Sequence, residues 1–154
     1  MSNTLDAVDR RLLEILQADG RITNLEMAER LGLSPTPVAR RWKRLEEEGY
    51  IRGYTALVDR KRVGYAVTAY VTVRLRSNNW QMAQQFEQSV AQLDYVMECA
   101  VVTGNADYLL RITARDLEDY ERFVKHELAV IDPVETIDST IVLSQTVERF
   151  RLPL

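Results

Sequence analysis

The stretch GLSPTPVARRWKRL, residues 32–45, decides the fold of the first part of the chain. Gly32 stands where a left-handed residue would end a preceding helix. Ser34 is a favoured N-cap residue, and Pro35 occupies the first helical position, where its missing N–H and fixed φ cost nothing. The apolar residues that follow recur at helical spacing and form a core-facing stripe: Val38, Trp42 and Leu45. The stretch therefore predicts a turn followed by a helix that runs to Gly49.

Two helical patterns precede this stretch. Apolar residues at helical spacing predict a helix over residues 6–18, and Gly20 follows it as a stop signal. Thr23 and Glu26 form a capping box that opens a second helix. The buried stripe of this second helix is expected to consist of Leu25, Ala28 and Leu31. Two helices joined by a tight glycine-containing turn, the second bearing cations, meet the requirements of helix-turn-helix DNA recognition.

The cations of the third helix carry the DNA-binding prediction. Projection at about 100° per residue points four side chains broadly away from the apolar stripe and puts Arg41 on its flank; the four are Thr36, Arg40, Lys43 and Arg44. The positive dipole end at residues 35–37 favours a phosphate, and the planar fork of arginine can hold a phosphate or a guanine edge. An isolated cation run usually faces water, but its place in a three-helix pattern favours DNA contact.

The first domain is expected over residues 1–60. The β-rich residues 50–58 predict a short ribbon or wing, and a charged linker follows at about residues 59–65. Residues 1–60 hold 10 basic and 10 acidic residues, so the whole net charge of -3 lies in the remainder. A pI of 5.3 argues against a nonspecific nucleic-acid coat protein, although it permits a local basic patch.

The second domain, expected over residues 66–154, alternates between strand and helix patterns. Apolar residues in alternation from Ala69 to Leu75 give the clearest strand, with one face buried. The patterns that follow predict a helix over residues 80–93, a hairpin of strands 95–102 and 108–113, a helix over 117–131 that Pro133 ends, and a strand over 136–147.

The resulting order is β-α-β-β-α-β, which is the ferredoxin-like arrangement of an antiparallel sheet with both helices on one face. The fold class is therefore α+β, with a winged helix-turn-helix followed by a ferredoxin-like domain. The other sheet face carries Val, Ala, Tyr and Thr and needs a cover. A homodimer with the two sheets face to face is expected.

Composition excludes several classes of protein. With 46% hydrophobic residues and a small net charge, the chain is predicted to fold rather than to be disordered. The single cysteine, Cys99, rules out an internal disulfide and fits a reducing compartment. The first residues lack a basic leader and an apolar segment, and no stretch is long enough for a membrane span, so a cytoplasmic location without membrane partners is expected.

Across nearly the whole chain the sequence resembles the Lrp/AsnC, or feast/famine, family of transcription regulators. In the first domain the resemblance rests on Leu5-Asp6 with Asp9, on LQADGR at 16–21, on GLSPTPV at 32–38, and on residues 44–54. In the second it rests on Val102-Thr103-Gly104 and Asp107-Tyr108-Leu109-Leu110, similar to the family's effector-sensing turn. The resemblance implies dimers that often assemble into octamers, with amino acids binding between subunits to change assembly and DNA affinity.

The resemblance also implies which residues bind. Together with the helix projection it assigns contacts to near-palindromic double-stranded DNA to Ser34, Pro35, Thr36, Pro37, Arg40, Arg41, Lys43 and Arg44. It assigns the amino-acid effector pocket to Val101, Thr103, Gly104, Asp107, Tyr108 and Leu117. Free amides near Gly104 can accept an α-carboxylate, and Asp107 can pair with an α-ammonium. Ala106 stands where many relatives carry an aromatic residue, which changes the pocket volume.

Two other classes compete with a regulator. Ferredoxin-like domains also host enzymes, but His126 is the single histidine, and a solvated helix position explains it better than a dyad with the distant Cys99. The sequence contains no glycine-rich phosphate loop and no metal-ligand cluster, so no cofactor or metal is expected. An amino-acid-binding interaction module would leave the cations of residues 40–44 unused. DNA binding discriminates between these classes.

Overall fold

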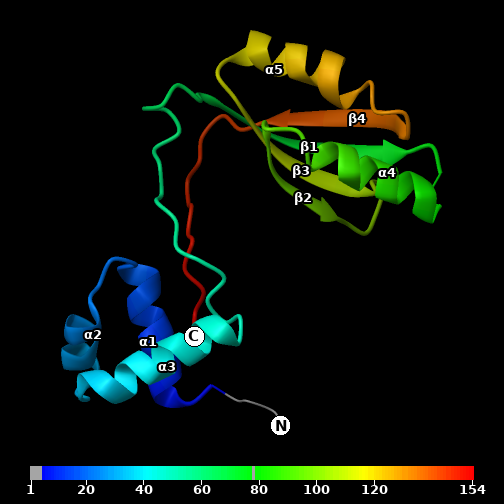
Figure 1. Ribbon diagram of the computed structural model, residues 1–154. Helices are drawn as coiled ribbons and strands as arrows, with labels where there is room; N and C mark the ends of the chain where they lie inside the picture. Colours follow the sequence, from blue (N-terminus) through cyan, green and yellow to red (C-terminus); the bar gives the residue numbers. More distant parts are fainter. Residues whose placement is uncertain (1–4, 78) are drawn as a thin grey trace. The chain divides into compact units, whose positions relative to one another are not determined.

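The structure is a computed structural model that describes residues 5–77 and 79–154 (Figure 1). The chain divides into two compact units, Val58–Thr146 and a first unit that combines Met1–Leu57 with Val147–Leu154. The second domain therefore ends earlier than the expected residue 154, because the C-terminal segment returns to the first unit. There the Gln17 amide donates to the Leu152 carbonyl (3.1 Å) and accepts from its N–H (2.6 Å). Each helix in the described part of the chain is too short or too polar to cross a bilayer.

Three helices form the first unit: α1 (Ala7–Ala18), α2 (Asn24–Leu31) and α3 (Pro35–Glu47). Capping boxes begin the first two, Asp6 with Asp9 at α1 and Thr23 with Glu26 at α2, and the second of these confirms the sequence prediction. Gly32 ends α2 at φ 65°, a left-handed conformation that glycine adopts without steric cost. Fully buried side chains from all three helices form the core: Leu12, Met27, Val38 and Leu45.

Two details of these helices differ from the prediction. Leu25 is 61% exposed, and Met27 takes its place in the core. Met27 lies about 200° around the helix from Leu25, so a stripe centred on Met27 and Ala28 turns Leu25 outward. Ser34 has the extended backbone of an N-cap residue, but its hydroxyl makes no capping hydrogen bond.

The predicted wing does not form a strand: residues 48–66 contain none. A ribbon requires a ladder of backbone hydrogen bonds with a partner. The segment is attached to α3 through a side chain instead, since the Tyr54 hydroxyl accepts from Trp42 Nε1 (2.5 Å) and donates to Glu46 Oε1 (2.7 Å). Trp42 is half-buried against the core, in accord with a packing role.

The second unit is a four-stranded antiparallel sheet with two helical segments. Its elements are β1 (Val67–Leu75), α4 (Trp80–Val90), β2 (Val96–Val101), β3 (Tyr108–Ala114), α5 (Leu117–Phe123) with the π-helical turn η1 (Val124–Leu128), and β4 (Val134–Ile141). The strand order β2-β3-β1-β4 confirms the ferredoxin-like topology. In the inner strand β1, Val71 pairs with Leu110 of β3 on one side and with Ser139 of β4 on the other.

Both helices lie on one face of this sheet (Figure 1). The alternate residues of β1 are fully buried there, and Phe86 of α4 and Phe123 of α5 pack on them. The last strand differs from its prediction, because β4 ends at Ile141 rather than near residue 147. In α5, Leu117 is 61% exposed and Phe123 is buried in the core. The π turn inserts an extra residue after Phe123, so one helical period does not fit the whole segment.

Candidate functional site

The exposed side of α3 brings most of the predicted DNA-contacting residues together. Thr36, Pro37, Arg40 and Lys43 are all exposed. Arg40 lies between two hollows. One, of about 380 Å³, is lined by Asn24, Pro35, Thr36, Ala39, Arg40 and Lys43. The other, of about 450 Å³, is lined by Asp6, Pro37, Arg40, Arg41 and Arg44. Ser34 is exposed at the start of the helix and lines neither hollow.

The cations of α3 fall into two groups. Arg40 has no ion-pair partner within the described residues, and the Lys43 side chain is 74% exposed with a single ion pair to Glu47 one turn along (3.4 Å). Arg41 and Arg44, in contrast, bind carboxylates of the α1 segment. Arg40 and Lys43 offer charge to a ligand at little cost, because neither cation must first leave a buried partner.

Arg44 makes an ion pair with α1 that the projection along α3 did not predict. Its Nη2 lies 2.5 Å from Asp9 Oδ2, and Arg41 Nη1 lies 2.9 Å from Asp9 Oδ1 and 2.6 Å from Asp6 Oδ2. The hydrogen bonds that Arg41 donates to the carboxylates of Asp6 and Asp9 raise the pKa of Arg41. The Asp9 backbone N–H and then Arg41 hold the pKa of Asp6 below its usual range. A projection along one helix does not include the side chains of a neighbouring helix, so it could not predict the ion pair with Asp9 of α1.

Asn24 is a site residue that the sequence prediction missed. Its Nδ2 donates to the Pro35 carbonyl (3.0 Å), which joins the start of α2 to the start of α3 beside Thr36. Its Oδ1 is buried without a hydrogen-bond partner among the described residues. A polar residue directly after an N-cap threonine gives no signal of this contact, because the partner lies eleven residues further along the chain.

The predicted effector residues separate into different places. Thr103 lines a hollow of about 370 Å³ on the open face of the sheet, with Thr72, Val73, Arg74, Val102, Asn105, Ala106, Leu109, Thr136 and Asp138. Gly104, in the same turn, has φ 113°, which requires glycine. The Arg74 guanidinium donates to the Asn105 carbonyl and holds the turn over the sheet. Of these lining residues, the predicted effector set contains Thr103, and the family resemblance also singled out Val102, Ala106 and Leu109.

Asp107 has a structural role that the sequence did not predict. Its Oδ2 accepts from the Leu75 N–H (2.8 Å), and its own N–H donates to the Val73 carbonyl (3.0 Å). The carboxylate therefore ties the end of β1 to the start of β3, and this bond occupies one of the oxygens expected to pair with an α-ammonium. The exposed Leu117 lines neither hollow of the second unit described here.

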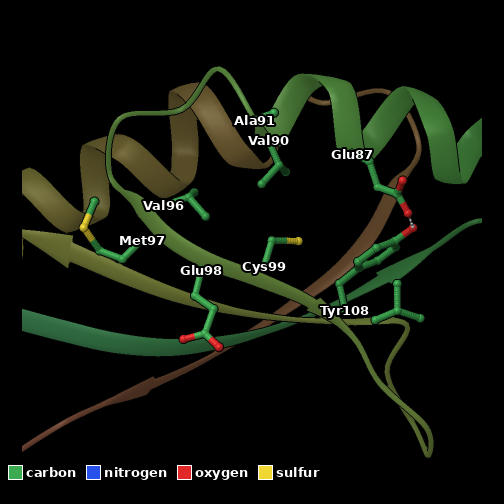
Figure 2. Close-up of a pocket in the computed structure, with 9 residues that line it drawn as sticks. Glu87, Val90, Ala91, Val96, Met97, Glu98, Cys99 and Tyr108 are labelled. Atoms are coloured by element: carbon green, nitrogen blue, oxygen red, sulfur yellow. Dashed lines mark hydrogen bonds between the residues drawn. The ribbon is translucent and has the colours of Figure 1, made fainter. Parts of the chain in front are cut away.

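Val101 and Tyr108 line a second hollow of about 420 Å³, between α4 and the edge of the sheet. Figure 2 shows Val96 and Cys99 turned toward α4, whereas Glu98 projects from the other side of the strand. The Tyr108 hydroxyl donates to Glu87 Oε1 (2.9 Å), and burial together with this carboxylate raises the pKa of Tyr108. Burial also raises the pKa of the Cys99 thiol, which favours the neutral form. Within the described residues no cluster of His, Cys, Asp and Glu could hold a metal.

Comparison with known proteins agrees with both units. The Lrp/AsnC ligand binding domain matches residues 68–152, and a winged helix-turn-helix DNA-binding domain matches residues 5–52. The Bkd operon transcriptional regulator of Pseudomonas aeruginosa is 38% identical over 150 residues, covering 97% of this chain and 98% of that protein. The leucine-responsive regulatory protein of Rhizobium meliloti is 39% identical over 141 residues, covering 92% and 90%.

Solved structures agree over nearly the same span. A transcriptional regulator from Neisseria meningitidis, in a complex with L-Met, has a TM-score of 0.93 and 35% identity, with 97% of each chain covered. An AsnC family transcriptional regulator from Agrobacterium tumefaciens has a TM-score of 0.92 and 34% identity, also with 97% of each chain covered. With this sequence, these folds and these matches, the chain belongs to the Lrp/AsnC family of transcriptional regulators.

Proposed function

We propose that this protein is a sequence-specific DNA-binding transcription regulator of the cytoplasm. The observation that carries the proposal is the exposed face of α3, where Arg40 and Lys43 stand beside the polar N-terminal turn. A helix of this kind fits the major groove, where the cations contact phosphates and base edges. The residues assigned to DNA contact are Ser34, Pro35, Thr36, Pro37, Arg40 and Lys43. Arg41 and Arg44 support them by holding α3 against α1 through ion pairs with Asp6 and Asp9.

The second unit senses an amino acid and joins subunits. The Neisseria relative binds L-Met and other relatives are leucine-responsive, which supports a small amino acid as the class of effector. The hollow at Thr103 and Ala106 on the open sheet face supplies polar groups and space for it. The same sheet face of a second subunit covers this face, and the resulting dimer presents two α3 helices to a near-palindromic DNA site. Octamers arise from such dimers, and the effector shifts DNA affinity by binding one assembly state better.

A mobility-shift titration of the full chain tests this function. The DNA is the region upstream of the protein's own gene, the control is a scrambled fragment of the same length, and KCl is varied with and without a pool of amino acids. Selective binding that weakens with salt and changes with an amino acid is expected. Equal affinity for upstream, scrambled and other genomic fragments would overturn the proposal and favour an enzyme or an amino-acid-binding interaction module.

A further inference from the structure

The four cations of α3 fall into two groups, because a carboxylate on α1, Asp9, binds Arg41 and Arg44 but neither Arg40 nor Lys43. We infer that Asp9 is a positioning residue for the recognition helix, which withdraws Arg41 and Arg44 from the DNA and leaves Arg40 and Lys43 to contact it. This inference rests on the proposed function, because it assigns the division of labour within the same surface.

The first support is the burial of Asp9. Its side chain is 1% exposed, whereas a carboxylate outside an ion pair or hydrogen-bond network is almost never so buried. Three donors meet it: the Asp6 N–H at 3.3 Å, Arg41 Nη1 at 2.9 Å and Arg44 Nη2 at 2.5 Å. The capping box that begins α1 fixes where this carboxylate stands. Asp9 is therefore a rigid anchor built into one helix for the guanidinium groups of another.

The second support is the geometry of α3. Arg41 and Arg44 are three residues apart and lie on one side of the helix, and their side chains are 32% and 37% exposed. Arg40 and Lys43 are also three residues apart, but on a side rotated by about 100°. Arg44 Nε is buried without a hydrogen-bond partner among the described residues, so this guanidinium depends on Asp9 for its charge compensation.

These contacts fix both the rotation and the position of α3 against α1. A recognition helix discriminates bases only when its exposed side chains meet the groove in one orientation. Free arginines at 41 and 44 would add phosphate contacts that are the same for every DNA sequence. The Asp9 anchor thus favours discrimination over total affinity.

The test measures DNA affinity against salt for full-length variants, with the upstream fragment and a scrambled fragment of the same length. Each phosphate contact adds about 0.9 to the slope of log K against log salt. Asp9→Asn frees Arg44, while Arg41 keeps its ion pair with Asp6. We therefore expect a slope on scrambled DNA steeper by about one and a selectivity for the upstream fragment about tenfold lower. Glu14→Gln is the matched control, because it removes one negative charge from α1 at the exposed pair with Arg11.

A second set of variants covers the case in which Asp9→Asn does not fold. Arg40→Gln is expected to lower the slope by about one, and Arg41→Gln and Arg44→Gln are expected to leave it unchanged. A folded Asp9→Asn with wild-type slope and selectivity would overturn the inference, as would an Arg44→Gln that lowers the slope as much as Arg40→Gln. Absence of selective binding by the wild type instead contradicts the proposed function, which separates the two failures.

Discussion

At the scale of single residues, the buried carboxylate of Asp9 contributes to the stability of the first unit. Asp9→Ala removes a buried acceptor of three hydrogen bonds, and the two arginines that remain are about a third exposed and can turn to water. The substitution is therefore expected to lower the free energy of unfolding by about 1–3 kcal/mol. The exposed pair of Arg11 and Glu14 supplies the control, since Glu14→Ala should cost less than about 1 kcal/mol. Urea unfolding followed by Trp42 fluorescence in a Trp80→Phe background measures both, and equal losses would contradict the account.

Three carboxyl groups make the free energy of unfolding depend on pH in the acidic range. Hydrogen bonds from backbone N–H groups lower the pKa values of Asp6, Glu26 and Asp119, with donors Asp9, Thr23 and Arg115 respectively as the main causes. A carboxyl group with a lowered folded pKa stabilises the fold fully above its unfolded pKa, and this contribution is lost as pH falls through the folded value. Stability is thus expected to hold from pH 7 to about 5 and to fall below about 4. A flat urea midpoint from pH 5 to pH 3 would contradict this cause.

The sequence predicted correctly which side chains are exposed or buried where the periodicity of one helix determines this. The period of α3 placed Thr36, Arg40 and Lys43 outside and Val38 inside. It did not predict the ion pair of Arg44 with Asp9, because Asp9 lies 35 residues away on another helix. A local sequence pattern carries no information about a partner so far along the chain.

At the scale of elements, Asp107 connects two strands. Its carboxylate accepts the Leu75 N–H, so Asp107→Ala removes the partner of a backbone donor at the end of β1. The expected cost is about 1–3 kcal/mol without any ligand present. Asp94→Ala, in an exposed turn, is the control and should change stability by less than about 0.5 kcal/mol. Thermal unfolding by circular dichroism compares the two, and an Asp107→Ala variant as stable as wild type would return Asp107 to a role in ligand binding alone.

The element order was predictable because alternation and helical spacing are strong local signals. Val71 and Val73 marked β1 by alternation, and Phe86 and Val90 marked α4 by helical spacing. The wing was not predictable, since β-rich residues 50–58 form a strand only where a partner ladder exists. The π turn after Phe123 was also missed, because an inserted residue changes the helical phase without a marker in the sequence.

At the scale of the whole molecule, the open sheet face is the proposed interface between subunits. Tyr70 is 39% exposed there and pairs with Arg111 of β3 and Thr140 of β4. Tyr70→Glu places a charge in the proposed dimer interface, where an unpaired buried charge is strongly unfavourable. Sedimentation velocity should show a shift from dimer to monomer, and Val130→Glu, at an exposed apolar position after α5, should leave the dimer intact. An unchanged dimer in Tyr70→Glu would exclude this face as the interface.

The two-unit organisation was predictable from the shift in composition near residue 60, but the path of the C-terminus was not. The Gln17 amide and the Leu152 backbone are 135 residues apart in sequence, and a glutamine in an amphipathic helix gives no sign of such a partner. Both ends of the chain therefore contribute to the unit that carries α3.

The most direct test of the central claim is the dissociation constant of the Arg40→Ala/Lys43→Ala double variant for the upstream DNA, measured by fluorescence anisotropy beside the wild type. Circular dichroism confirms the fold, and sedimentation confirms that assembly is unchanged. The variant is expected to fold and to bind with an affinity weaker by about tenfold or more. A folded double variant that binds the same fragment with wild-type affinity would contradict the assignment of α3 as the DNA-binding surface.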